Sequence, residues 1–193
     1  MQQTHAPSAY SYPLLIKQLW HTPMSCHQDQ EIVSGPEKRF SYRQLRERIG
    51  RLAAGLESIG VKPGNTVAVM DWDNHRYLEC FFGVPMMAAV LHTINVRLSP
   101  EQILFTINHA EDDFILLHAD FVPIIEQIRD RIETSPQFIF LRDDALTPRP
   151  DFCEYEYESL LKQADADYEF QDFDENTVAT TFYTTGTTGD PKA

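Results

Sequence analysis

The residues best suited to chemistry stand near the end of the sequence, where residues 184–192 read TTGTTGDPK. Gly186 and Gly189 can adopt positive φ at no steric cost, so successive backbone N–H groups can face a single anion. The threonine hydroxyls add hydrogen-bond donors, and Lys192 adds a positive charge that suits phosphate. The segment therefore predicts a phosphate-binding loop.

The simplest alternative is a threonine- and glycine-rich turn that merely ends a strand. The segment is not the common nucleotide loop G-x-x-x-x-G-K-[ST], because Asp190 and Pro191 separate Gly189 from Lys192. Residues 183–192, YTTGTTGDPK, closely resemble the phosphate loop of the AMP-forming acyl-adenylate enzymes, written Y-T-[ST]-G-T-T-G-x-P-K-G. Ala193 is one departure from this pattern, since the family usually has glycine there.

The resemblance implies a reaction in two steps. A carboxylate attacks the α-phosphorus of MgATP to give an acyl-adenylate and pyrophosphate, and the thiol of coenzyme A then displaces AMP to give a thioester. Positioning and charge neutralisation would dominate such catalysis. By the same resemblance, the ATP phosphates would be held by Thr184, Thr185, Gly186, Thr187, Thr188, Gly189 and Lys192. Thr184 is also the candidate hydroxyl near Mg²⁺, an ion held mainly by phosphate oxygens and water.

The resemblance also implies which groups are missing from these 193 residues. In this family the adenine pocket, acyl tunnel, ribose-binding aspartate, hinge and catalytic lysine come later in the chain, so no catalytic residue is assigned. We expect the sequence to be an amino-terminal fragment of a longer ligase, and the fragment alone to be inactive. An incomplete sheet leaves an open edge and uncovered apolar surface. This predicts self-association, with a homodimer as one form.

Earlier segments extend the resemblance. Residues 40–45 (FSYRQL) and 60–67 (GVKPGNTV) resemble the family's amino-terminal helix and the strand that follows it. Residues 91–101 (LHTINVRLSPE) resemble the fatty-acid–CoA ligase branch, in which Asn-x-Arg-Leu recurs. A fatty acid, ATP and coenzyme A are therefore the expected small-molecule substrates. An adenylating enzyme for an amino acid or an aromatic acid, and a binding module without catalysis, are the alternatives that stay open.

Other polar residues have structural explanations. We interpret Asn95 as a turn amide and Arg97 as a surface or helix-capping cation, rather than as substrate contacts. Trp72, Asn74 and His75 follow a strand end and could line a cleft. We nevertheless expect Trp72 to pack and His75 to be exposed at the start of a helix.

The elements that must position the loop alternate along the chain. Apolar and β-branched runs predict strands over 31–34, 66–70, 89–92, 114–117, 138–141 and 178–183. Helices are predicted over 13–20, 41–59, 75–87, 121–132 and 157–163, and another begins at Ser99. This alternation predicts a doubly wound α/β fold with a largely parallel sheet, in which ligands bind at the carboxyl ends of strands. The last strand has the composition of a buried one and leads directly into the loop.

Two helix starts carry a local signature. Ser41 with Gln44, and Ser99 with Gln102, have the spacing of a capping box. Four arginines follow the first of these starts, and we expect them to be solvated on the outer face of the helix. They are Arg43, Arg46, Arg48 and Arg51.

Composition limits the partners. The net charge of −13 argues against nucleic acid and against anionic membrane surfaces. Residues 143–175 hold twelve acidic side chains against two basic ones, which indicates a docking surface or, as we favour, a solvated loop region. We therefore describe the chain as a single domain. It has a loose leader over 1–12, an acidic loop region over 142–176, and the final strand with its loop over 177–193.

Cysteine usage bears on location. Cys26, Cys80 and Cys153 are odd in number and far apart, which favours free thiols in a reducing compartment and no structural metal. The first twelve residues lack the apolar core of a signal peptide. The longest apolar run, residues 80–91, is too short to cross a bilayer. We expect a cytoplasmic protein without a transmembrane segment.

Overall fold

The computed structural model describes residues 8, 10, 12–36, 38–184 and 191–193. Its centre is a parallel sheet of six strands in the order β7-β6-β5-β3-β4-β8. The strands are β3 (Thr66–Met70), β4 (Val90–Thr93), β5 (Phe114–His118), β6 (Gln137–Leu141), β7 (Tyr155–Glu156) and β8 (Thr180–Phe182). A separate antiparallel pair is formed by β1 (Glu31–Ser34) and β2 (Lys38–Ser41). The predicted α/β fold with a largely parallel sheet is confirmed.

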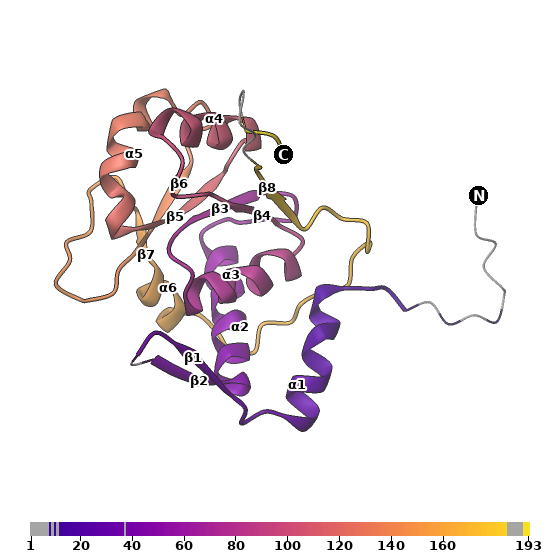
Figure 1. The fold of residues 1–193 in the computed structure, drawn as a ribbon. Helices are drawn as coiled ribbons and strands as arrows, with labels where there is room; N and C mark the ends of the chain where they lie inside the picture. The colour runs from indigo at the N-terminus through magenta and orange to yellow at the C-terminus, as the bar shows by residue number, and fades with distance from the viewer. Residues whose placement is uncertain (1–7, 9, 11, 37, 185–190) are drawn as a thin grey trace.

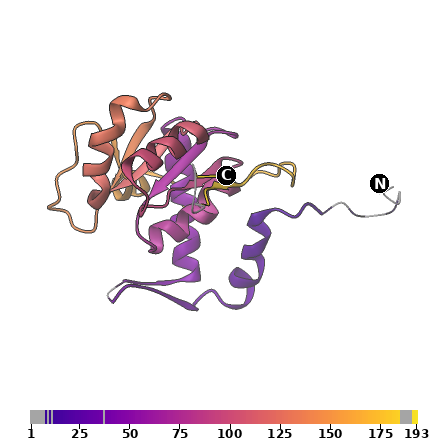
Figure 2. The ribbon, with the colours of Figure 1, turned by 45° about the horizontal axis from the view of Figure 1, so that its top comes forward.

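Helices cover both faces of this sheet (Figure 1). The helices are α1 (His21–Cys26), α2 (Tyr42–Ser58), α3 (His75–Met86), α4 (Pro100–Ala110), α5 (Val122–Ile128) and α6 (Tyr157–Gln163). Short 3-10 turns precede α1 (Ile16–Trp20) and flank α5 (Ala119–Phe121 and Arg129–Arg131). In two views, α1 and the β1–β2 pair lie on the α2 side of the molecule, away from α4 and α5 (Figure 1, Figure 2).

Alternation along the strands divides the core into two layers. Val67 and Val69 of β3 pack into the cluster that contains the buried face of α2, including Leu45. Ala68 and Met70 point the other way, into the cluster that contains the buried residues of α4 and α5. Because successive side chains of a strand face opposite sides, an uninterrupted apolar run is what a sheet covered on both faces requires.

Local signals place the helix starts as the sequence predicts. Ser41 accepts a hydrogen bond from Gln44 N at 3.2 Å, and Ser41 N donates to Gln44 Oε1 at 2.8 Å. Ser99 and Gln102 form the second capping box. Gly60, at φ +103°, follows the end of α2 in a conformation that favours glycine.

The strand before the predicted loop differs from expectation. β8 pairs only with β4 among the described strands, so it lies at an edge of the sheet. Val178 is 62% exposed and Phe182 is 58% exposed. The prediction of a buried strand over 178–183 is therefore wrong, because composition cannot tell an edge strand from a central one.

The arginine prediction is also wrong in part. Only Arg43 is strongly exposed, at 51% of its side chain. Arg48 pairs with the buried Glu79 and with Glu158, and Arg51 donates to the backbone oxygen of Ala164 at 2.6 Å. The guanidinium of Arg46 lies 5.0 Å from the ring centroid of Phe170. Acidic and aromatic groups from distant segments cover this face of α2.

Three further features complete the comparison. The helix expected over 13–20 is a 3-10 turn followed by α1, and the strands β2 and β7 were not predicted. No helix of the described residues is both long and apolar enough to span a membrane. Cys26, Cys80 and Cys153 are free thiols, and only Cys26 is exposed.

Candidate functional site

A cleft of about 570 Å³ opens where β3, β4 and β8 end. Its walls come from the segments that follow β3 and β4, from α3, and from β8 and the residue after it. The lining residues are Asp71, Trp72, Asp73, Tyr77, Phe81, Thr93, Ile94, Asn95, Val96, Arg97, Thr180, Phe182 and Tyr183. Loops at the carboxyl ends of neighbouring parallel strands meet at one edge, which is where such folds bind ligands.

Two of the predicted phosphate ligands are described, and they lie together. Thr184 N donates to Lys192 O at 2.8 Å, and Lys192 N donates to Thr184 O at 3.0 Å. Thr184 Oγ1 also donates to Lys192 O, at 3.3 Å. Both residues are exposed. The other predicted phosphate ligands, Thr185, Gly186, Thr187, Thr188 and Gly189, lie outside the described residues.

The described groups fit a phosphate better than they fit a metal. Lys192 supplies a cation and Thr184 a hydroxyl, the donors that a polyphosphate chain requires. The part of the chain that the structure describes contains no cluster of three or more His, Cys, Asp or Glu residues able to hold a metal. Among the described loop residues, Thr184 is the one hydroxyl that a bound Mg²⁺ could take as a ligand beside phosphate oxygens and water.

The turn after β3 is held by a buried carboxylate. Asp71 is 3% exposed and accepts hydrogen bonds from Trp72 N at 2.7 Å, Asn74 Nδ2 at 3.0 Å and Arg76 Nε at 3.0 Å. Asn74 in turn caps α3 through the N–H groups of Arg76 and Tyr77. The network fixes the direction in which this turn faces the cleft.

Trp72 both packs and borders the cleft. Its ring centroid lies 4.8 Å from that of Phe121, and Nε1 donates to Asp120 Oδ2 at 2.7 Å. The residue nevertheless remains 46% exposed and lines the cleft. The expectation that Trp72 packs is confirmed, although the packing covers only part of the side chain.

Asn95 and Arg97 behave as expected. The side-chain oxygen of Asn95 accepts a hydrogen bond from Arg97 N at 3.0 Å, as a turn amide does. Arg97 is an exposed cation. Both residues also line the cleft, so the structural role does not remove them from the site.

His75 is the clear correction among these residues. It is 4% exposed rather than solvated, and its ring stacks on Phe40 at 5.1 Å between centroids. The β1–β2 pair covers the start of α3, and Ser34 Oγ accepts a hydrogen bond from His75 N. Burial, followed by the positive charges of Lys38, Arg48 and Arg76, lowers the pKa of His75 to about 3. His75 is thus a neutral packing residue.

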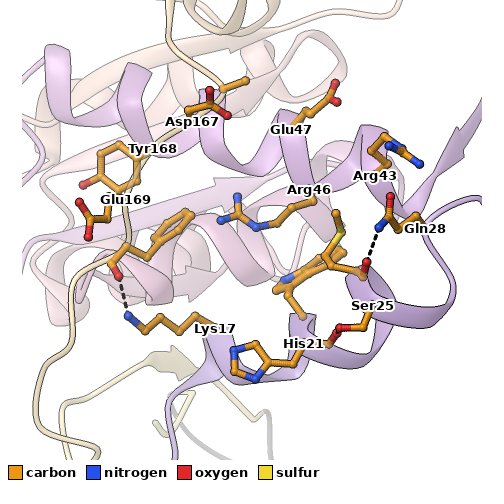
Figure 3. A pocket seen from close by; sticks show the side chains of 14 residues that line it. Lys17, His21, Ser25, Gln28, Arg43, Arg46, Glu47, Asp167, Tyr168 and Glu169 are labelled. Carbon is orange, nitrogen blue, oxygen red and sulfur yellow. Dashed lines mark hydrogen bonds between the residues drawn. The ribbon is translucent and has the colours of Figure 1, made fainter.

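A larger cavity, of about 850 Å³, lies away from the strand ends, between α1, α2 and residues 166–170 (Figure 3). Lys17 Nζ donates to Phe170 O at 2.6 Å and pairs with Asp172 at 2.6 Å. The labelled side chains around it carry both signs of charge, with Lys17, Arg43 and Arg46 against Glu47, Asp167 and Glu169 (Figure 3). These contacts attach the acidic segment to the amino-terminal turn and to α2. Basic and acidic side chains are equally represented around the cavity, so its charge does not indicate a charged ligand.

The contacts among three residues beside the predicted loop were missed by sequence reasoning. Tyr183 OH lies 2.8 Å from His109 Nδ1, and its ring centroid is 5.2 Å from that of His92. His92 is fully buried on β4 and hydrogen-bonded to Asp112. A histidine inside an apolar strand was the available signal, but its partner comes twenty residues later.

The fold and the cleft define an α/β protein whose ligand-facing loops stand at the carboxyl edge of a parallel sheet. Residues 21–193 match the family described as AMP-binding enzyme. The chain belongs to this family, and the suspected resemblance is confirmed.

Individual proteins that match the chain are named as CoA ligases. A 3-methylmercaptopropionyl-CoA ligase of Ruegeria pomeroyi is 36% identical over 186 residues, covering 93% of this chain and 34% of the relative. A long-chain-fatty-acid–CoA ligase of Thermus thermophilus is 38% identical over 168 residues, covering 84% and 29%. The crystal structure of an anthranilate CoA ligase in complex with anthranoyl-AMP has the same fold, with a TM-score of 0.84 at 18% identity over 94% of this chain and 34% of that chain. The chain thus spans about a third of the length of the relatives it matches.

Proposed function

We propose that the chain is the ATP-phosphate-binding part of a fatty-acid–CoA ligase. The observation that carries the proposal is the backbone pairing of Thr184 with Lys192 beside the cleft. This pairing brings Thr184 and Lys192 together, and both belong to a string that resembles the phosphate loop of the family. An ammonium group and a hydroxyl at that point suit the β- and γ-phosphates of ATP.

The reaction that this arrangement would serve transfers an adenylyl group. The substrate carboxylate attacks the α-phosphorus, and the bond from that phosphorus to the bridging oxygen breaks, so pyrophosphate leaves. Lys192 would offset the charge that builds on the leaving phosphates, and the loop donors would hold them in line. When bound, Mg²⁺ supplies further charge neutralisation. The thiolate of coenzyme A then attacks the acyl carbon and AMP leaves.

The proposal also concerns the identity of the acid substrate. Residues 91–101 favour a fatty acid, and apolar side chains such as Phe81, Ile94 and Phe182 line the cleft beside Tyr183. The relatives described above are named for a long-chain fatty acid and for 3-methylmercaptopropionyl-CoA. An amino acid or an aromatic acid is the second candidate, because the phosphate loop does not discriminate between acids.

Carboxylate-dependent exchange of pyrophosphate into ATP tests the assignment. The experiment uses the longest natural polypeptide that contains this sequence, with short, medium and long fatty acids, amino acids and benzoate. Exchange supported by fatty acids is expected. Exchange supported only by an amino acid or benzoate would overturn the fatty-acid assignment. If no acid supported exchange, the assignment as a ligase would be overturned and a binding module would be favoured.

We also propose that the 193-residue chain alone makes no acyl-adenylate. It spans about a third of the length of its relatives, and the resemblance assigns the adenine, ribose and catalytic lysine positions to later segments. Incubation of the purified chain with ATP, Mg²⁺ and fatty acid, followed by mass spectrometry, is expected to find no acyl-AMP. Detection of acyl-AMP above a Lys192→Met control would contradict this.

Self-association and location complete the proposal. β8 presents an edge that is open among the described strands, so the 193-residue chain is expected to associate, as a homodimer or a larger species. Light scattering that gives a monomer mass at every concentration would contradict this expectation. Three free thiols favour the cytoplasm, and cell fractionation tests that location.

A further inference from the structure

We propose that His92 and His109 are positioning residues that hold Tyr183, and through it the start of the phosphate loop. The proposal rests on the proposed function for its effect on ATP, whereas the anchoring itself is a structural claim. Tyr183 directly precedes Thr184, whose backbone pairs with Lys192. A displacement of Tyr183 therefore also displaces Thr184 and, through the backbone pairing, Lys192.

The strand register brings His92 under Tyr183. His92 pairs with Thr181 across β4 and β8, so the two side chains share a face of the sheet. Tyr183 is two residues beyond Thr181, and alternate residues of a strand face the same side. The observed separation of 5.2 Å between the His92 and Tyr183 ring centroids agrees with this arrangement. His92 thus contacts the tyrosine ring from the neighbouring strand, with the two ring planes inclined at 60°.

Asp112 fixes the orientation of His92. Its two carboxylate oxygens each lie 2.9 Å from His92 Nδ1, and both side chains are completely buried. A carboxylate only accepts hydrogen bonds, so Nδ1 donates and the imidazole cannot rotate without losing this contact. The other ring nitrogen, Nε2, is buried and has no hydrogen-bond partner among the described residues.

A buried pair of this kind needs a reason other than stability. An apolar pair of similar volume would avoid the cost of removing both groups from water. A flat, rigidly oriented ring is what the position provides instead. The ring lies against Tyr183, the residue that precedes Thr184, and this makes support of Tyr183 the use that fits.

His109 holds the other end of Tyr183. It projects from the last turn of α4, and its Nδ1 lies 2.8 Å from the phenolic oxygen. The two rings meet edge to face, with centroids 5.7 Å apart and an interplanar angle of 83°. Tyr183 is thereby held at its ring by β4 and at its hydroxyl by α4.

The test compares variants that remove each contact. His109→Ala and Tyr183→Phe delete the hydrogen bond between α4 and the tyrosine, and neither side chain is buried, so both proteins are expected to fold. His109→Asn keeps a polar group near the Nδ1 position and is the conservative rescue.

His92→Leu removes the oriented ring, while His92→Asn retains a donor toward Asp112. His27→Ala changes an exposed histidine at the end of α1 and is the matched control.

The first measurement does not depend on activity. Amide hydrogen exchange of Thr184 and Lys192, without nucleotide, is expected to accelerate about 3- to 10-fold in His109→Ala and Tyr183→Phe, as loss of one hydrogen bond implies. The double variant should match the single variants, because both changes delete the same bond. Unchanged exchange, or strictly additive effects, would overturn the anchoring role.

The second measurement is made on the longest natural polypeptide. The KM for ATP is expected to rise about 3- to 10-fold in His109→Ala and His92→Leu, with the KM for the acid unchanged, and to return toward wild type in His109→Asn. It is expected to stay raised in His92→Asn, which keeps a donor toward Asp112 but lacks the ring. Equal changes in both KM values, or changes that only follow thermal stability, would overturn the positioning role. If the wild-type protein bound no ATP, the proposed function would fail. The amide hydrogen exchange data would still show whether His109 holds Tyr183 in place.

Discussion

The carboxylate of Glu79, fully buried on α3, receives two hydrogen bonds from the guanidinium of Arg48 on α2, at 2.6 and 3.2 Å. Tyr157 OH of α6 donates to the same carboxylate at 2.6 Å. Arg48 also pairs with Glu158 at 2.7 Å. One ionic network therefore joins three helices on the same side of the sheet.

Removal of Arg48 is expected to be strongly destabilising. Burial raises the pKa of Glu79, while the hydrogen bonds and charge of Arg48 act against this rise. Arg48→Met leaves that carboxylate buried without its cation, so the free energy of unfolding should fall by about 3 to 5 kcal/mol in urea titrations. Arg48→Met combined with Glu79→Gln should recover part of the loss. Arg43→Met, at an exposed arginine of the same helix, should change stability by less than about 0.5 kcal/mol. Equal losses in the two single variants would contradict this.

His75 should make stability depend on pH. Its pKa is about 3 in the folded protein, against about 6.5 for an unperturbed histidine. Between these values the unfolded chain binds one more proton, so the free energy of unfolding falls as pH decreases, by at most about 1.4 kcal/mol per pH unit and less where solvent screens the charge. His75→Gln removes this contribution. The Tm difference between wild type and variant should therefore shrink from pH 8 to pH 5, and a constant difference would refute the assignment.

Gly50 should not tolerate alanine. Helix propensity alone predicts that Gly→Ala within α2 stabilises by about 1 kcal/mol. A Cβ at Gly50 would instead overlap with the backbone oxygen of Ala166, in the segment that packs on α2. Gly50→Ala should lower the free energy of unfolding by about 1 to 3 kcal/mol. In Gly83→Ala the new methyl meets a side-chain end, Leu52 Cδ2 at 2.9 Å, which can move. The loss there should be smaller, and the opposite order would contradict the prediction.

Lys192 should govern phosphate affinity. Loss of a charge-assisted hydrogen bond weakens binding by about 1.5 to 3 kcal/mol, so Lys192→Met should raise the Kd for ATP by about 10- to 100-fold. The effect should decrease at high ionic strength, since salt screens an exposed charge. Calorimetry on the longest natural polypeptide measures both. Lys162→Met, at an exposed lysine of α6, is the control. Similar Kd values for ATP in the two variants would show that Lys192 does not contribute to phosphate binding.

Features that depend on neighbours in the sequence were predictable from it. The capping boxes at Ser41 and Ser99 involve residues three positions apart, and the apolar runs of β3, β5 and β6 reflect burial on both faces of a sheet. The alternation of strands and helices then defined the α/β class. The string over residues 183–192 indicated the family, because it resembles the family's phosphate loop, and the family is confirmed. That the string binds phosphate stays a prediction.

Features that depend on distant partners were decided by the tertiary structure. Arg48 and His75 looked solvated in the sequence, yet Glu79, Glu158 and Phe40 cover them from other elements. Tyr183, which follows β8, meets β4 and α4 through contacts that no sequence spacing encodes. The sequence by itself determined the local turns, the strand periodicity and the loop motif, since short-range sterics and hydrogen bonds control them. Only the fold decided which charges are buried and which side chains meet at the cleft, because burial and pairing depend on the groups that packing brings opposite each residue.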